Sequence, residues 1–132
     1  MKTFELQIVT PDREVYNGQA ESVLVPTTEG VIEILAGHID YMAALNIGKM
    51  RVTAESQDKI AACSDGFMTV SGGNVRIVCT TFEFASEIDV DRANKAKEKA
   101  EQRLSSKLDE RTEKLVKAKL MRALNRIKVA EL

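Results

Sequence analysis

The chain has 132 residues, 44% of them apolar, which is enough for one domain with a small appendage but not for two full domains. It shows no signal-peptide pattern, and no apolar run approaches the length of a membrane span, so we expect a protein that is soluble or peripheral to something that is not. The net charge of −1 hides an asymmetry, because residues 1–85 carry 6 basic and 11 acidic side chains and residues 86–132 carry 13 and 9. The basic C-terminal part is therefore expected to meet an acidic surface.

Residues 2–84 show the two-residue period of β-strands. Phe4, Leu6 and Ile8 alternate with polar residues until the sequence TPD at 10–12 breaks the run. The sequence SGGN at 71–74 predicts a hairpin turn. Many short strands separated by turns predict an antiparallel β-sandwich or flattened barrel. The predicted strands span residues 4–8, 20–26, 31–35, 49–54, 60–63, 67–71 and 75–80.

From residue 85 the period changes to that of an α-helix and predicts an antiparallel helical hairpin over residues 85–132. Asp89 is placed to cap the first helix, and the second helix is expected at about 110–129, after a polar connection. Alanines let two helices approach closely, but they bury little apolar surface. Because each Å² of buried apolar surface stabilises by only about 25 cal/mol, the hairpin should be held weakly. The apolar positions are Ala93, Ala96, Ala100 and Leu104 in the first helix and Leu115, Ala118, Leu120, Met121, Leu124 and Ile127 in the second.

The residue types of common catalytic and metal sites form no constellation in this sequence. The glycines at 72 and 73 lie between two strands, so they predict a turn and not a phosphate loop. His38 is the only histidine and has no cysteine or carboxylate at the spacing of a metal site. Cys63 and Cys79 suit small buried hydrophobes in a reducing compartment. We therefore expect neither catalytic residues nor a metal site, and not an enzyme.

Three arginines can converge at the open end of the hairpin. If the chain turns near residue 107, Asp89 lies opposite Arg126 and Arg92 lies near residue 123, while Arg122 and Arg126 share a helix face. Arginines beside a helix N-terminus form a good site for an anion such as phosphate. The other interpretation is that Asp89 is only a cap and that the arginines are solvated or paired with acids or a partner. Spacing alone favours this second interpretation.

Five stretches, in this order, carry a resemblance to a known family. They are VTPDREVY (9–16), LAGHID (35–40), SDGFMTVSGGNVRIV (64–78), IDVDRA (88–93) and ALNRIKVAEL (123–132). They are distributed from residue 9 to residue 132, and over essentially its whole length the chain resembles the epsilon subunit of bacterial F-type ATP synthases.

The resemblance implies a non-catalytic rotor subunit of the central stalk that couples ion flow to ATP synthesis. The sandwich, residues 1–84, would bind the gamma subunit and the ring of c subunits at the cytoplasmic side of the bacterial cell membrane. The regulatory hairpin, residues 85–132, would fold onto the sandwich or extend along gamma. When extended, its basic second helix would reach the catalytic beta subunits and inhibit ATP hydrolysis. From Arg111 onward the chain has 7 basic and 2 acidic residues, which fits an acidic partner.

The resemblance also implies a regulatory ATP site, because IDVDRA matches the family's ATP-binding pattern. A folded hairpin would then bind ATP, which is not a required cofactor and which this chain would not hydrolyse. The residues implied are Glu83, Ile88, Asp89, Arg92, Ala93, Arg122 and Arg126.

The loop that carries His38 departs from the family pattern. It reads GVIEILAGHID at 30–40 and lacks the two prolines that the family usually has there. His38 is expected to contact the c ring, and the alternative is a loop histidine with a local hydrogen bond.

Two other classes of function stay open at this point. A free-standing module could bind nucleic acid through its basic helices, but the chain is not strongly basic overall and no aromatic residue stands among the basic residues of either helix. A small sandwich enzyme would need a nucleophile or metal cluster, and the sequence offers none. We therefore expect no nucleic-acid partner.

Overall fold

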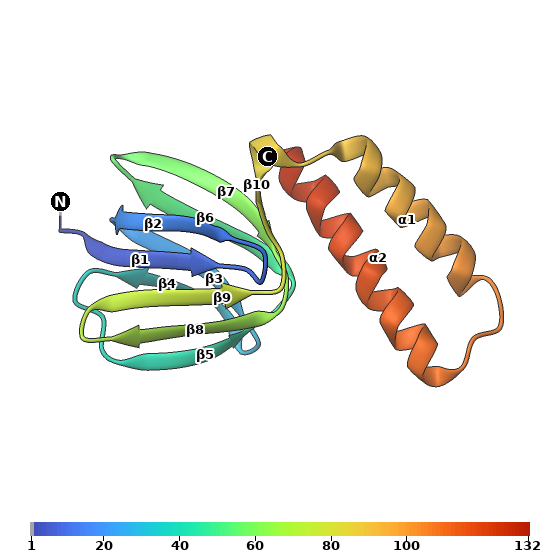
Figure 1. Ribbon diagram of the computed structural model, residues 1–132, viewed down its shortest axis with the longest axis horizontal. Coiled ribbons are helices and arrows are strands. Elements are labelled where there is room, and N and C mark those ends of the chain that lie inside the picture. The colour runs from blue at the N-terminus through green and yellow to red at the C-terminus, as the bar shows by residue number, and fades with distance from the viewer. Residues whose placement is uncertain (1) are drawn as a thin grey trace.

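Alternating apolar residues give a ten-stranded sheet, and the helical period gives two helices beside it (Figure 1). The computed structural model describes residues 2–132. The strands are β1 (Phe4–Val9), β2 (Glu14–Ala20), β3 (Ser22–Thr27), β4 (Gly30–Leu35), β5 (Tyr41–Leu45), β6 (Gly48–Ala54), β7 (Gln57–Cys63), β8 (Gly66–Ser71), β9 (Asn74–Cys79) and β10 (Phe82–Phe84). A 3₁₀ turn, η1 (Ala85–Glu87), leads to α1 (Val90–Leu104) and α2 (Glu110–Ala130).

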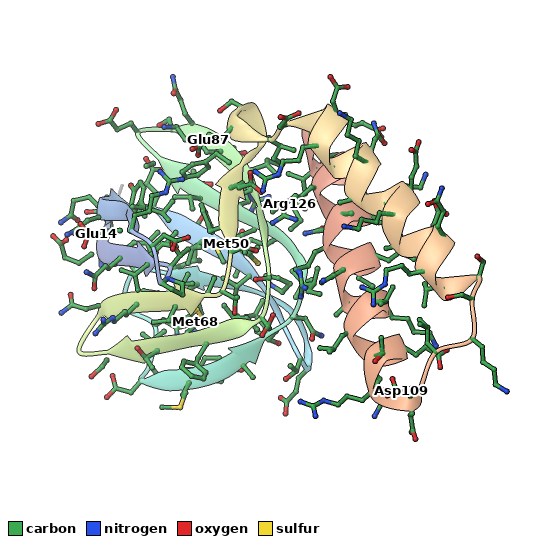
Figure 2. All side chains as sticks on the ribbon, turned by 45° about the vertical axis from the view of Figure 1, so that its right-hand side comes forward. Glu14, Met50, Met68, Glu87, Asp109 and Arg126 are labelled. Atoms are coloured by element: carbon green, nitrogen blue, oxygen red, sulfur yellow. The ribbon has the colours of Figure 1, made fainter. Side chains whose placement is uncertain are left out.

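The sheet curls on itself and encloses one apolar core. Its strand order is β10-β7-β6-β3-β5-β8-β9-β1-β2, with β4 paired to β3, and every pair is antiparallel except β1 with β9. Figure 2 shows Met50 and Met68 inside the curled sheet. The predicted fold, a β-sandwich or flattened barrel followed by a helical hairpin, is confirmed. The largest fully buried side chains of this core are Leu6, Ile8, Ile34, Met50, Met68 and Ile77.

Each of the seven predicted strand regions contains a strand, but β2, β5 and β10 are not predicted as strands in their own right. β2 contains Asn17 and Gly18, which favour turns, and it is held in the sheet by pairing along its length with β1. β5 lacks β-branched residues and pairs with all of the first five residues of β8. Tertiary pairing therefore overrides weak local preference in these strands.

The turn between β8 and β9 is the predicted hairpin turn. Gly72 and Gly73 have φ angles of 58° and 81°, and the flanking residues Ser71 and Asn74 are paired. Two consecutive positive φ angles are the requirement of a tight hairpin turn that matches the twist of the strands, and glycine meets it without strain. These glycines therefore serve the chain reversal.

Both helices begin at an aspartate cap. The Asp89 carboxylate accepts a hydrogen bond of 3.1 Å from the backbone N–H of Arg92, which confirms the predicted cap. Asp109 does the same for the N–H of Thr112, at 2.9 Å. Each bond satisfies one of the N–H groups that a helix leaves unpaired in its first turn.

The buried face of α2 differs from the prediction. Val116, Ala123 and Val129 are buried, whereas the predicted positions Leu115, Met121 and Leu124 are 59%, 56% and 44% exposed. The sequence pattern gives more weight to the larger leucines than to the smaller residues that fit a close helix pair. In α1, Ala93 and Ala100 are buried as predicted, and Ala96 is exposed.

The hairpin rests on the sandwich through α2, which contacts β6 and β7. The Asn125 side chain donates a 2.8 Å hydrogen bond to the backbone oxygen of Gly48 at the start of β6.

Cys63 and Cys79 are buried free thiols, as expected. A hydrogen bond between them raises the pKa of Cys63, with burial adding to the effect, and lowers the pKa of Cys79. Neither α1 nor α2 is long and apolar enough to cross a membrane.

Candidate functional site

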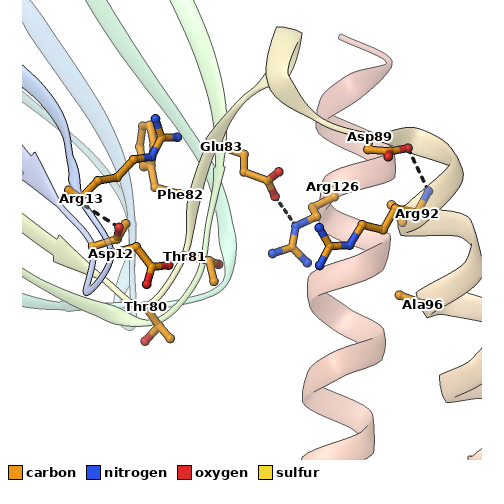
Figure 3. Close-up of a pocket in the computed structure, with 12 residues that line it drawn as sticks. Asp12, Arg13, Thr80, Thr81, Phe82, Glu83, Asp89, Arg92, Ala96 and Arg126 are labelled. Carbon is orange, nitrogen blue, oxygen red and sulfur yellow. Dashed lines mark hydrogen bonds and ion pairs between the residues drawn. The ribbon is translucent and has the colours of Figure 1, made fainter.

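A cavity of about 410 Å³ lies where the sandwich meets the open end of the hairpin (Figure 3). Its walls come from the β1–β2 turn, the segment from Thr80 into β10, the first turns of α1 and the C-terminal half of α2. It therefore joins segments from both parts of the chain. The lining residues are Thr10, Asp12, Arg13, Thr80, Thr81, Phe82, Glu83, Asp89, Arg92, Ala93, Ala96 and Arg126.

The N-terminus of α1 places Asp89 and Arg92 at this cavity. The cap at Asp89 fixes the first turn, and Arg92 follows in that same turn. Figure 3 shows the Arg92 side chain extending from α1 toward the guanidinium of Arg126 on α2, and both residues line the cavity. This places two positive groups beside the positive end of a helix dipole, an arrangement that attracts an anion.

An ion pair between Glu83 and Arg126 joins the sandwich to the hairpin. The Arg126 Nε atom lies 2.5 Å from a Glu83 carboxylate oxygen, and the two side chains are 28% and 33% exposed. Glu83 is the middle residue of β10 and pairs with Ala62 of β7, so its position is set by the edge of the sheet. Together with the Asn125 bond, this pair forms what we call the latch: Arg126 with Glu83, and Asn125 with Gly48.

The charges around the cavity are not all neutralised in pairs. Arg13 lies 3.3 Å from Glu87, and Arg126 is paired with Glu83. Arg92 has no carboxylate within 4 Å among residues 2–132. A free guanidinium in a mixed polar cavity suits the binding of a phosphate or carboxylate group.

The structure brings five of the seven predicted ATP-site residues around this cavity. These are Glu83, Asp89, Arg92, Ala93 and Arg126. Arg122 lies instead along a neighbouring groove between the two helices. Ile88 is half-buried in the connection before α1 and is not among the lining residues.

Besides Ala96 of α1, six lining residues, all from the sandwich, are not among the site residues predicted from the sequence. They come from two connections of the sandwich whose local pattern indicates only turns and strand ends. Nothing in the spacing relates residue 12 to residue 126, because their proximity depends on how α2 docks. The six are Thr10, Asp12, Arg13, Thr80, Thr81 and Phe82.

His38 lies in the loop between β4 and β5, which Figure 1 shows at the end of the sandwich away from the helices. Its Nδ1 atom is 2.7 Å from the backbone oxygen of Ile39, and its ring centroid is 5.8 Å from that of Tyr41. The histidine is therefore held by local contacts and takes no part in the cavity. In the part of the chain that the structure describes, no three His, Cys, Asp or Glu residues are grouped as a metal site would require.

Comparison with known families decides what kind of protein carries this site. The family profile of the ATP synthase delta/epsilon chain β-sandwich domain matches residues 3–85, and that of the long α-helix domain of the same chain matches residues 86–131. The chain belongs to the ATP synthase delta/epsilon chain family. Membership makes it a non-catalytic subunit and not an enzyme.

Two of three curated relatives of this epsilon-type chain match nearly its whole length, and the third matches about four fifths of it. The ATP synthase epsilon chain of Shouchella clausii is 41% identical over 131 residues, which is 99% of this chain and 97% of the relative. That of Bacillus velezensis is 41% identical over 98% of both chains. The Alkaliphilus oremlandii chain is 46% identical over 79% of this chain and 78% of its own.

Solved structures share the fold of this epsilon-type chain. A chain of the Euglena gracilis mitochondrial ATP synthase, in a structure of OSCP, F1 and the c-ring, has a TM-score of 0.70 at 24% identity, over 98% of this chain and 78% of that one. A chain from the central stalk and c-ring of the Tetrahymena thermophila mitochondrial enzyme has the same TM-score at 14% identity, over 98% and 97%.

Proposed function

We propose that this chain is a rotor subunit in the central stalk of a bacterial F-type ATP synthase, where it couples ion flow to ATP synthesis. It would sit at the cytoplasmic side of the cell membrane through its partners, the gamma subunit and the c-subunit ring. Family membership and the epsilon-chain relatives support this role. The sandwich also exposes large apolar side chains, which mark surfaces that bind other proteins. These are Val31, Leu35, Ile39, Met42 and Phe67, between 54% and 76% exposed.

The loop with His38 is the part of the sandwich that we propose faces the c ring. Ile39 follows the histidine and is 76% exposed, so an apolar side chain stands beside a polar one at a surface away from the hairpin. Replacement of Ile39 by Asp would place a charge at this contact. Reconstituted vesicles should then lose coupled ATP synthesis, while the purified variant keeps its circular dichroism spectrum. Unchanged coupling would argue against this contact.

The hairpin is the regulatory element of the proposal, and ATP is its ligand. The observation that carries it is the composition of the cavity, to which the sandwich contributes Glu83, α1 contributes Asp89 and Arg92, and α2 contributes Arg126. A nucleotide bound there would contact all three elements and hold the hairpin folded. At a concentration of 100 times its Kd, such a ligand stabilises the folded state by about 2.7 kcal/mol.

Release of the hairpin would allow inhibition of ATP hydrolysis. Its buried positions are mostly alanine and valine, and the latch adds only two polar contacts to the sandwich, so the folded and released states would differ by a few kcal/mol. The released α2 is strongly basic and would contact an acidic surface of the catalytic beta subunits.

Isothermal calorimetry of the full chain with ATP and with ADP, with and without Mg²⁺, tests the ligand. Arg92→Ala should abolish binding, because among residues 2–132 Arg92 is the cavity arginine without an acidic partner, and the latch does not use it. Lys95→Ala is the matched control, since Lys95 lies one turn away on the same helix and outside the cavity. Equal ATP affinity in both variants would refute the nucleotide site, and absence of binding to the unaltered chain would leave the hairpin without this ligand.

A further inference from the structure

A second groove, lined almost entirely by cations, runs between α1 and α2. It encloses about 280 Å³ and has five basic side chains around a floor of two alanines and a valine, with no acidic residue. It shares Ala96 and Arg126 with the larger cavity, so the two hollows adjoin. The residues of this cationic groove are Ala96, Lys99, Ala100, Arg103, Val116, Lys119, Arg122 and Arg126.

Four of the five cations have no acidic partner in the part of the chain that the structure describes. Among residues 2–132, Arg126 is the only one of the five within 4 Å of a carboxylate. On the same hairpin, Lys117 is paired with Glu113 at 3.1 Å, so acids are present but lie elsewhere. Like charges three and four residues apart on a helix repel one another. The cationic groove therefore concentrates uncompensated positive charge that an anion would neutralise.

The cations form two facing rows. Lys99 and Arg103 are one turn apart on α1, while Lys119, Arg122 and Arg126 extend over about 10 Å of α2, at 1.5 Å per residue. The helices are antiparallel, so the rows lie along one groove that leads from the cavity toward the connection between the helices. Arg126 is at the cavity end, and Arg103 and Lys119 are the residues of each row nearest the connection.

A linear chain of phosphates fits this arrangement. It carries negative charge at short, regular intervals, and both guanidinium and ammonium groups bind phosphate oxygens. The small volume and the alanine floor leave little room for the side chains of an acidic peptide. The basic rows also extend past Arg122 and Arg126, the two residues of α2 that the family resemblance assigns to nucleotide binding.

We infer that the cationic groove binds a linear phosphate chain longer than a triphosphate, with Arg103 and Lys119 as the distal anion subsite. The inference rests on the proposed nucleotide role for the position of the first phosphates. The chain would come from a nucleoside polyphosphate or from inorganic polyphosphate. Either would bridge α1 and α2 along more of their length than ATP does and would hold the hairpin closed more firmly.

Calorimetry with four probes tests this inference on the full chain. The probes are ATP, adenosine 5′-tetraphosphate, inorganic tripolyphosphate and a longer linear inorganic polyphosphate. The test variant is Arg103→Ala with Lys119→Ala. The matched control is Lys95→Ala with Lys114→Ala, which removes one exposed lysine from each helix outside the groove.

We expect adenosine 5′-tetraphosphate to bind about tenfold more tightly than ATP, and the longer polyphosphate about tenfold more tightly than tripolyphosphate. This gain is what two additional exposed ion pairs, with Arg103 and Lys119, together provide. The test variant should lose this gain and the control variant should keep it. A gain with adenosine 5′-tetraphosphate but not with inorganic polyphosphate identifies a nucleotide as the source, and the reverse identifies the inorganic chain.

Equal affinity for long and short chains, or an equal loss in the test and control variants, would overturn the inference. The nucleotide site is judged separately, by ATP itself. Binding of ATP without any gain from added phosphates would leave that site standing and remove the distal subsite. Binding of the longer polyphosphate without binding of ATP would remove the nucleotide site and leave the distal subsite standing.

Discussion

Breaking the Glu83–Arg126 ion pair should release the hairpin from the sandwich. The two side chains are about a third exposed, so the pair lies between a surface ion pair, worth up to about 1 kcal/mol, and a buried charged hydrogen bond, worth about 1.5–3 kcal/mol. We therefore assign it about 1–2 kcal/mol. Glu83→Gln should raise the opening constant of the hairpin roughly 5- to 30-fold.

Native-state hydrogen exchange of the α2 amides measures this opening directly, because released helices lose protection. The control is Glu113→Gln, which breaks the exposed pair with Lys117 on the same helix and should change α2 exchange by less than about threefold. Exchange of the β8 amides should not change in either variant, since Met68 and Val70 of this strand belong to the core of the sandwich. Equal α2 protection in Glu83→Gln and Glu113→Gln would refute the latch.

Three further outcomes follow from the helix caps and the domain arrangement. Asp89→Ala should cost about 1 kcal/mol of α1 stability, measured by thermal denaturation, and Asp89→Asn should restore most of it, because either side chain can accept from the Arg92 N–H. The Thr112 side chain and N–H lower the pKa of Asp109 below its usual 3.8, so this cap stabilises α2 above that pH and is lost as the pH falls through the lowered value. Amide exchange at the start of α2 should therefore rise in acid, and Asp109→Asn should abolish that dependence. A chain of residues 1–85 should stay folded and keep its near-ultraviolet spectrum, because the sheet core contains no helical residue; loss of cooperative melting would contradict this.

The helices and the main strands are predictable because their signals are local. The Asp89 cap, the change from a two-residue to a helical period and the Gly72–Gly73 turn each depend on neighbouring residues only. β2 and β5 are harder to predict, since their local preferences are weak and their pairing partners supply the stability. The buried face of α2 is mispredicted for a related reason: close packing on alanines selects Val116 and Ala123 over the larger Leu115 and Leu124.

Only part of the candidate site can be predicted from the sequence. Hairpin geometry relates Asp89 and Arg92 to Arg126, because two antiparallel helices with a short connection have a fixed register. It says nothing about Asp12, Arg13 or Phe82, which reach the cavity only because α2 docks on β6 and β7. That docking depends on polar contacts such as Asn125 with Gly48, and a single hydrogen bond between residues 77 positions apart leaves no periodic trace.

Arg126 can hold the latch and a ligand at the same time. Its Nε atom is paired with Glu83, and a guanidinium has further N–H donors on its two terminal nitrogens. In Figure 3 this group lies between Glu83 and the guanidinium of Arg92, which lines the same cavity. An anion bound between the two arginines would therefore strengthen the folded hairpin without displacing Glu83, since Glu83 keeps the guanidinium oriented for it. It follows that Glu83→Gln should weaken anion binding as well as docking, although Glu83 itself is negatively charged. If Glu83 acted only by repelling the anion, Glu83→Gln would instead strengthen anion binding. The direction of the change in anion affinity therefore decides whether Glu83 acts by orienting Arg126 or by charge repulsion.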